Sequence, residues 1–403
     1  MKRSIRRDRW VRMLYALPLA LAACSGGVPE EESSSHAATD AQAALSSDCT
    51  GLRPDRAGPW LSDASFSEGE EATCGIGPSD GLGHVPVASN NTMSGMTLWK
   101  VLGLEAGRGS GYFWYLDRAD LLPQHDGFIS VDYIWHMGET HLKSWGAGGS
   151  LRKDTMLMTS DFVRPVPDFG SGALVAYAAG DGHLVAQRFV SDGTPRSEPA
   201  EVAMLSRKPA WIAAGVNADR DTLVLFEGAA AGLEPSHIAG RWLSATGVPR
   251  TDVFDLGALS LSAMAGAQAP SLYPLYDGSL VLQWDGAWIM RIAARATKAT
   301  AVPSWLSARP DMRPVWIRGG RGYGLIPSEG RNVPACYQQI RIHAQDGNYC
   351  GTVTLGVDDQ PCVTQRLEVG LDGTVIQRSP RTSCEGDPAV CTCTVRWWPG
   401  LLR

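Results

Sequence analysis

Short apolar runs bounded by tight-turn signals fill most of the chain beyond residue 50. Leu174 to Tyr177 precede Gly180-Asp181-Gly182, and Leu280 to Trp284 lie between Asp277-Gly278 and Asp285-Gly286. Asp-Gly steps readily adopt the positive φ angles that two-residue hairpins require. Runs of this length, separated by such turns, are typical of antiparallel strands, and helical periodicity is scarce. The pattern therefore predicts an all-β body built from hairpins.

A weak repeat underlies the hairpins. One apolar residue follows six of the turn signals, at Ile129, Leu184, Leu223, Leu280, Leu325 and Val375. The separations are 55, 39, 57, 45 and 50 residues, and this spacing resembles that of four-stranded blades in β-propeller repeat proteins. We expect an irregular six- or seven-bladed propeller-like domain over residues 49–403, in which Cys393 to Trp398 pair with an N-terminal strand. One or two β-sandwich domains are the alternative.

The N-terminus has the layout of an export signal. Six basic residues and one acid lie within the first 12 positions, and Met13 to Ala20 form an apolar stretch. That stretch is far shorter than the roughly 20 residues that cross a bilayer as a helix. Residues 1–23 are therefore interpreted as a cleavable signal peptide rather than a membrane helix.

The end of this signal, Leu21-Ala22-Ala23-Cys24, resembles the lipobox of bacterial lipoproteins, and the resemblance covers residues 1–27. It implies cleavage between Ala23 and Cys24, a diacylglycerol thioether on Cys24, and further acylation of the new amino group with fatty acids such as palmitate. Ser25 at the following position favours the outer membrane of a bacterial cell envelope. The alternative is an ordinary secretory signal with an incidental cysteine.

Residues 24–48 combine Ser, Ala, Gly and acids with almost no large apolar groups. Such a segment cannot bury enough surface to offset its chain entropy, so it is expected to be a disordered tether. Removal of the signal leaves 30 basic against 41 acidic residues, a formal charge of −11. This charge excludes nucleic acid as a favoured partner and leaves the acyl chains as the membrane contact.

Eight cysteines remain when Cys24 is assigned to lipid, an even number in a compartment that permits disulfides. They are Cys49, Cys74, Cys336, Cys350, Cys362, Cys384, Cys391 and Cys393. If Asp372-Gly373 forms a two-residue hairpin, Cys362 faces position 383, which favours a Cys362–Cys384 bridge. Cys49 and Cys74 form the natural local pair. A zinc site at Cys391-Thr392-Cys393 is the alternative to structural disulfides.

Two sequence patterns suggest catalysis but lack the context that catalysis requires. Gly77-Pro78-Ser79-Asp80-Gly81 matches G-x-S-x-G, yet no apolar strand precedes it and no helix follows, so a plain turn is predicted. His136 and His141 flank Glu139, which invites a metal site. Their offset of five, however, places the two imidazoles on opposite faces of a strand. No metal or cofactor is predicted.

The densest aromatic region, from Tyr112 to Trp135, is interleaved with carboxylates. Its candidate binding residues are Trp114, Asp117, Asp132, His136 and Glu139, because aromatic rings beside acids can hold a glycan. Core packing is the alternative. We expect a membrane-anchored, noncatalytic binding or scaffold module for a protein or glycan. A propeller-based hydrolase or lyase that uses Asp117, Asp132, His136 and Glu139 is the second hypothesis, so enzymatic activity stays open.

Overall fold

The structure of the chain is a computed structural model, in which a compact unit begins at Ala44 and extends to Arg403. The structure describes residues 45–52, 60–66, 72–91, 96–102, 109–116, 120–134, 138–157, 163–228, 230, 232–234, 236–258, 270–284, 286–317, 319, 321–328, 339–355, 367–385 and 390–403. The predicted signal peptide, the cleavage position at Ala23 and the predicted lipidation residue Cys24 lie outside these residues.

Within the described residues, the strands form seven four-stranded antiparallel sheets, which we call blades 1 to 7. Blade 1 contains β2 (Ala72–Ile76), β3 (Val85–Asn91), β4 (Met96–Leu102) and β5 (Gly109–Leu116). Blade 2 contains β6 (Asp120–Gln124), β7 (Gly127–Ile134), β8 (Glu139–Gly146) and β9 (Leu151–Leu157). Blade 3 contains β10 (Val163–Pro167), β11 (Gly172–Ala178), β12 (His183–Val190) and β13 (Ala200–Met204).

The next three blades continue in chain order. Blade 4 contains β14 (Ile212–Val216), β15 (Thr222–Glu227), β16 (His237–Leu243) and β17 (Phe254–Ala258). Blade 5 contains β18 (Ser271–Pro274), β19 (Leu280–Trp284), β20 (Ala287–Ile292) and β21 (Ala299–Thr300). The short helix α1 (Ser304–Ser307) leads to blade 6, which contains β22 (Met312–Trp316), β23 (Gly322–Pro327), β24 (Gln339–Ala344) and β25 (Tyr349–Thr354).

Blade 7 joins the two ends of the compact unit. It contains β26 (Leu367–Val369), β27 (Val375–Glu385) and β28 (Val390–Trp398), and its fourth strand is β1 (Trp60–Phe66) from the N-terminal part. Trp60 lies opposite Trp397, and Ala64 lies opposite Cys393. The predicted pairing of the closing strand with an N-terminal strand is therefore confirmed.

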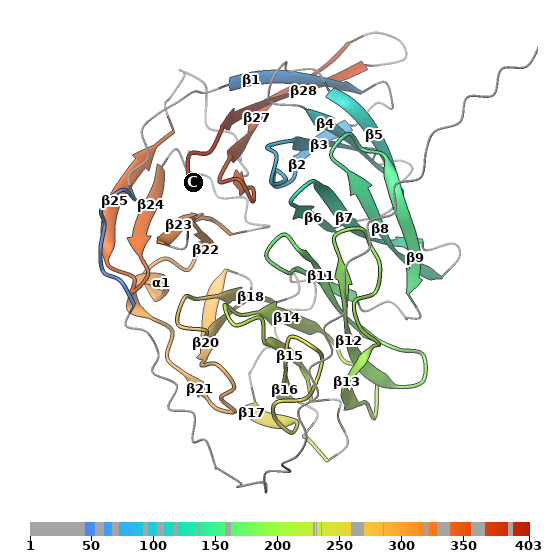
Figure 1. Cartoon of the computed structure of the whole chain (residues 1–403), viewed down its shortest axis with the longest axis vertical. Coiled ribbons are helices and arrows are strands. Elements are labelled where there is room, and N and C mark those ends of the chain that lie inside the picture. Colours follow the sequence, from blue (N-terminus) through green and yellow to red (C-terminus); the bar gives the residue numbers. More distant parts are fainter. Residues whose placement is uncertain are drawn as a thin grey trace, which may run out of the picture. The chain divides into compact units, whose positions relative to one another are not determined.

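Apolar cores between successive blades hold the sheets in a ring. Leu174 of blade 3 and Val224 of blade 4 belong to one core, and further cores join blades 2 and 3, 4 and 5, 5 and 6, and 6 and 7. β5 contacts β7, and β2 contacts β27, which completes the circuit. Figure 1 shows the sheets arranged around a common centre.

This arrangement is a β-propeller. The propeller predicted from the repeat is confirmed, with seven sheets among the described residues, inside the predicted range of six or seven. Sandwich domains would pack two sheets face to face, whereas each sheet here packs against two neighbours around the ring.

Two details of the predicted repeat are wrong. Five of its six apolar positions lie on the second strand of a blade, but Leu184 lies on β12, the third strand of blade 3. The turn at Asp181-Gly182 joins second to third strands instead of first to second. The Asp372-Gly373 turn is also wider than two residues, since Val369 pairs with Val375 and the Gly370 amide donates to the Thr374 carbonyl.

The Cys49–Cys74 pairing is also wrong, because Cys49 forms a disulfide with Cys350, 301 residues away. The chain segment around Cys49 crosses the turn between β24 and β25, where the Asp346 amide donates to the Ser46 carbonyl. Leu52 is buried in the core between blades 6 and 7. These contacts bring Cys49 to blade 6, away from Cys74 on β2 of blade 1.

The remaining cysteines are described in part. Cys336 and Cys362 lie outside the described residues, so the predicted Cys362–Cys384 bridge stays a prediction. The backbone register places Cys384 of β27 opposite Cys391 of β28, and Cys393 opposite Thr382.

Candidate functional site

The aromatic and acidic region predicted to bind a ligand is divided between blades 1 and 2. Trp114 lies on β5, but only its backbone is described, and Asp117 and His136 lie outside the described residues. Asp132 lies on β7 and Glu139 on β8. The structure therefore places two of the five predicted side chains.

Asp132 is a buried carboxyl group, 1% exposed, on the inner part of blade 2. The ammonium Nζ of Lys143 lies 3.2 Å from its Oδ2. Burial raises the pKa of Asp132 to about 7, although the Lys143 charge and a hydrogen bond from Ser130 act in the opposite direction. This environment is that of an interior ion pair, and a buried carboxyl group alone does not define a site.

Glu139 belongs to a separate group at the surface of the same blade. Its Oε2 lies 3.1 Å from Nε2 of His141, whose Nδ1 lies 2.7 Å from Oδ1 of Asp154. Burial lowers the pKa of His141, but the hydrogen bonds to Asp154 and Glu139 raise it above its ordinary value. Among the described side chains, no group of three His, Cys, Asp or Glu residues is arranged to hold a metal ion.

The G-x-S-x-G segment is a turn, as predicted. Oδ1 of Asp80 accepts hydrogen bonds from the amides of Leu82 and His84, which is the geometry of a turn capped by its own aspartate. Ser79 is buried, and its hydroxyl donates to Oδ1 of Asp372 in blade 7 at 2.7 Å. Ser79 therefore joins the turns of blades 1 and 7.

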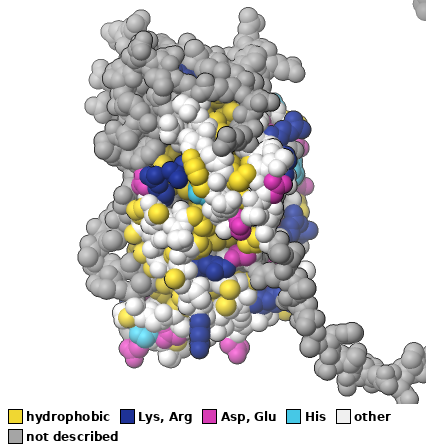
Figure 2. Space-filling view, turned by 90° about the vertical axis from the view of Figure 1, so that its left-hand side faces the viewer, with side chains coloured by type: hydrophobic (Ala, Val, Ile, Leu, Met, Phe, Trp, Pro, Cys, Tyr) yellow, Lys and Arg dark blue, Asp and Glu magenta, His cyan; other side chains and the backbone are white. Residues whose placement is uncertain are grey.

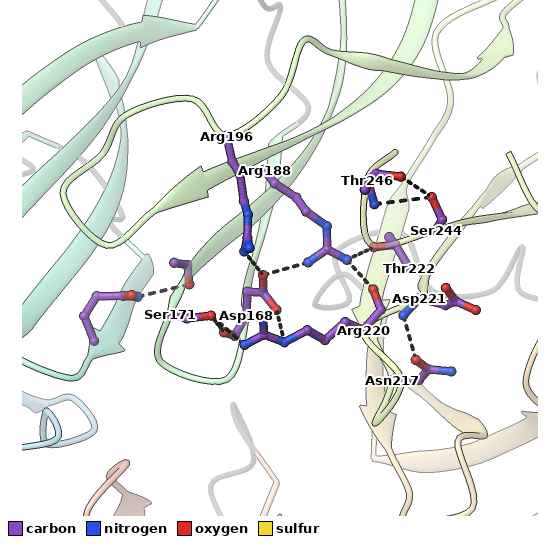
Figure 3. A network of polar contacts seen from close by, with 12 residues as sticks. Asp168, Ser171, Arg188, Arg196, Asn217, Arg220, Asp221, Thr222, Ser244 and Thr246 are labelled. Atoms are coloured by element: carbon purple, nitrogen blue, oxygen red, sulfur yellow. Dashed lines mark hydrogen bonds and ion pairs between the residues drawn. The ribbon is translucent and has the colours of Figure 1, made fainter. Parts of the chain in front are cut away.

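A cluster of arginines and buried aspartates, not predicted from the sequence, lies at one end of the propeller. At this end, each blade has the turn between its first and second strands and the turn between its third and fourth strands. We call this end of the propeller the turn face. There the carboxylate of Asp168, 1% exposed, accepts a 2.7 Å hydrogen bond from Nη1 of Arg188. Nη2 of Arg188 donates to the Arg220 carbonyl and to Oγ1 of Thr222. Figure 3 shows these groups converging from blades 3 and 4.

Two more arginines approach Asp168 from the surface (Figure 3). Nη1 of Arg196 lies 4.0 Å from Oδ2, and Nε of Arg220 lies 3.9 Å from Oδ1. Both distances exceed that of a hydrogen bond, and the two side chains are 47% and 41% exposed. Nη2 of Arg220 also donates to Oγ of Ser171 at 2.9 Å.

Asp221 of the blade 4 turn repeats this arrangement. It is 2% exposed and accepts a 2.7 Å hydrogen bond from Nε of Arg295, and Nε of Arg250 lies 3.6 Å away. Both arginines are nearly half exposed. Asn217 supports the turn, because its Oδ1 accepts from the Asp221 amide.

Backbone strain coincides with this cluster. Among the described residues, the non-glycine residues with positive φ are Phe169 (47°), Arg220 (62°) and Arg295 (58°). Left-handed conformations cost free energy in residues with a Cβ, and they gather at functional sites. Two of these three residues, Arg220 and Arg295, are themselves arginines of the cluster.

Aromatic side chains fill the neighbouring central part of the turn face. The rings of Phe169 and Trp316, from blades 3 and 6, lie 5.0 Å apart. Trp316 also stacks on Tyr276 of blade 5 with 4.4 Å between centroids. Burial raises the pKa of Tyr276. These contacts tie three blades together near the centre of the ring.

A short sequence signal marks the cluster. Gly193-Thr194-Pro195-Arg196 and Gly247-Val248-Pro249-Arg250 share the pattern G-x-P-R. They occupy the same turn of blades 3 and 4, with matching bridges between Phe189 and Pro195 and between Leu243 and Pro249. A search for repeats in turns, rather than in apolar positions, would have found it. Figure 2 shows one side of the molecule, where charged side chains are interspersed with apolar ones.

The arginine cluster can bind an anion, because guanidinium groups have planar forks of donors that match oxyanions.

In the described part of the chain, no helix is long and apolar enough to cross a bilayer.

Comparison with known proteins found similar solved structures but no relative in sequence. No family model matches the chain, and no curated protein matches it in sequence. Solved structures similar to it include the β-propeller domain of the Trilobed protease from Pyrococcus furiosus (9% identity, TM-score 0.42, covering 76% of this chain and 89% of that one). The propeller of Dos1 (9%, 0.40, 78% and 75%) and Hsv2 from Kluyveromyces lactis (9%, 0.38, 81% and 97%) are similar too.

Proposed function

We propose that the chain is a lipoprotein of the bacterial outer membrane, anchored through Cys24, whose propeller is a noncatalytic binding module for a protein or glycan. The observation that carries the binding role is the arginine cluster of the turn face. Arg196, Arg220, Arg250 and Arg295 are each between 41% and 47% exposed, around two buried carboxylates.

Solvent-exposed arginines held by buried acids are suited to recognition. Their ion pairs with Asp168 and Asp221 hold them in place, so less conformational entropy is lost when a partner binds. Arginine is also enriched among the residues that dominate binding energies at protein interfaces. The hydrolase or lyase hypothesis has no comparable support, since Asp132 is buried beside Lys143 whereas Glu139 pairs with His141 at the surface.

The anchor is tested by metabolic labelling of the full chain with an alkyne-tagged palmitate in a Gram-negative host. Wild type should carry the label and sediment with outer membranes. The Cys24→Ser variant should lose the label. An unlabelled wild-type protein would show that the signal is an ordinary secretory signal.

The binding role is tested by photo-crosslinking in the same cells. A photoreactive residue replaces Val248, which is 60% exposed beside Arg250 on the turn face. The matched control replaces Met156 on the outer strand β9, which is 52% exposed. A discrete adduct at position 248 that is absent at position 156 is expected. The same pattern at both positions, or none at either, would contradict a binding surface at the turn face.

A further inference from the structure

We infer that Arg196 and Arg220 form a binding site for a carboxylate group of an acidic polypeptide segment. The inference rests on the proposed binding function and names its ligand chemistry. Asp168 is surrounded by Arg188, Arg196 and Arg220, so this group of four charges has a net charge of +2. The charge that stays uncompensated lies at the surface, on the two half-exposed arginines.

The three arginines have different roles because they lie at different distances from the Asp168 carboxylate. Arg188 takes the 2.7 Å hydrogen bond to Asp168 and is almost fully buried, so it serves the fold. Arg196 and Arg220 lie 4.0 and 3.9 Å from the same carboxylate, beyond hydrogen-bond length. Their donors can therefore turn to a second carboxylate without breaking the buried pair.

The conformation of Arg220 supports a role beyond packing. Its φ of 62° is unusual for a residue with a long side chain. The Arg220 carbonyl accepts from buried Arg188 at 2.6 Å, which holds the strained backbone in place. This backbone conformation places the guanidinium group of Arg220 beside Asp168 and Ser171.

The surroundings favour a carboxylate on a flexible polypeptide over the closely spaced charges of a phosphate-rich glycan or an anionic lipid surface. Asp192 is offset by Lys153 and Arg152, whereas Glu198 and Asp219, in or next to the same turns, are exposed acids. These charges repel a phosphate-rich glycan or an anionic lipid surface, whose many charges would come near them. A polypeptide can place one carboxylate between the arginines and keep its other groups away. The neighbouring Phe169 ring is partly buried and offers an apolar contact.

The test measures binding of fluorescein-labelled hexaglutamate to the full lipidated protein in detergent micelles, by fluorescence polarisation. Hexaglutamine and inorganic pyrophosphate are the comparison ligands. Hexaglutamate should bind, hexaglutamine should not, and raising the salt concentration should weaken binding, since the contact is between charges. Arg196→Gln should weaken hexaglutamate binding tenfold or more.

Arg207→Gln is the matched control variant. Arg207 is 49% exposed and pairs with Glu227, so it resembles Arg196 in exposure and partner type but lies on a different connection. Its loss should leave hexaglutamate binding unchanged. Circular dichroism of both variants should match wild type, because neither residue is buried.

Three outcomes would overturn the inference. These are no hexaglutamate binding by wild type, equal weakening in both variants, or pyrophosphate binding that depends on Arg196 while hexaglutamate does not bind. None of them would remove a crosslinked adduct at position 248, so the failure of the carboxylate site is distinguishable from the failure of the binding function.

Discussion

At the scale of single residues, burial decides whether a charged group supports the fold or stays open to a partner. Arg188 and Asp168 are 4% and 1% exposed and pair at 2.7 Å. Arg196 contacts the same carboxylate but is 47% exposed. Residues of the same type in one network should therefore contribute very differently to stability.

Arg188→Met should lower the free energy of unfolding by about 3–5 kcal/mol, because it leaves the Asp168 carboxylate buried without its main partner. Arg196→Met should cost about 1 kcal/mol or less, since an exposed pair is screened by water. Urea denaturation of both variants measures the difference. Equal losses would show that the three arginines share the carboxylate evenly.

Asp132 provides a pH-dependent prediction. Burial raises its pKa to about 7, whereas the ordinary value in an unfolded chain is about 3.9. Between these values the folded protein holds a proton that the unfolded chain has lost. This group's contribution to stability is therefore greatest below pH 4 and falls as the pH rises toward 7, by up to about 4 kcal/mol.

Asp132→Asn should remove that dependence, because the amide does not ionise. Relative to wild type, the variant should become progressively more stable from pH 4.5 to 7.5 in urea denaturation. The comparison at each pH cancels the titration of other groups. A constant difference between the two proteins would mean that Asp132 titrates normally in the fold.

At the scale of elements, the connections between strands carry the special chemistry. Cys350 lies on β25, three residues after the turn glycine Gly347, as Arg196 and Arg250 follow the equivalent turn glycines of blades 3 and 4. Cys350 forms the disulfide with Cys49. A disulfide that closes a long loop stabilises mainly by restricting the unfolded chain. Replacing both cysteines with serine should lower stability by about 2–5 kcal/mol in urea denaturation. An unchanged urea midpoint would mean that the apolar contacts of Leu52 hold the N-terminal segment on blade 6 without the disulfide.

The register of β27 and β28 predicts a second bridge. Directly opposite residues of antiparallel strands have Cα atoms about 4.5–5.5 Å apart, within the range that a disulfide spans. Cys384 and Cys391 are such a pair, so we expect a Cys384–Cys391 bridge in place of the Cys362–Cys384 bridge predicted from the sequence. Peptide mapping under nonreducing conditions tests it, and recovery of Cys384 linked to Cys362 would contradict it.

At the scale of the whole molecule, the ring depends on one N-terminal strand. β1 is the outer strand of blade 7, beside β28 (Figure 1). Without it, the N–H and C=O groups along β28 would form an open sheet edge, which promotes association between chains.

Replacing residues 60–66 with a seven-residue Gly-Ser stretch should reduce stability and produce concentration-dependent oligomers in size-exclusion chromatography. The change keeps Cys49 and the chain length. The control replaces residues 30–36, which precede the compact unit, and should elute like wild type. A monomeric strand variant with unchanged stability would show that the cores between blades close the ring without β1.

Local chemistry in the sequence was enough to predict the strands, the propeller and the turn at Ser79. Asp-Gly turns and apolar runs act over a few residues, so they can be recognised in one chain, and the repeat of about 50 residues implies blades. The sequence also makes Cys24 the predicted anchor. Leu184 was misassigned because a turn signal does not say which pair of strands it joins.

Tertiary structure alone decided the partners of distant residues. Nothing in the sequence joins Cys49 to Cys350, because their proximity comes from the path of the N-terminal segment across blade 6. Arg188 and Arg196 look equivalent until burial separates them. The arginine cluster arises where turns of blades 3, 4 and 5 meet at one end of the ring, and packing between successive blades brings those turns together.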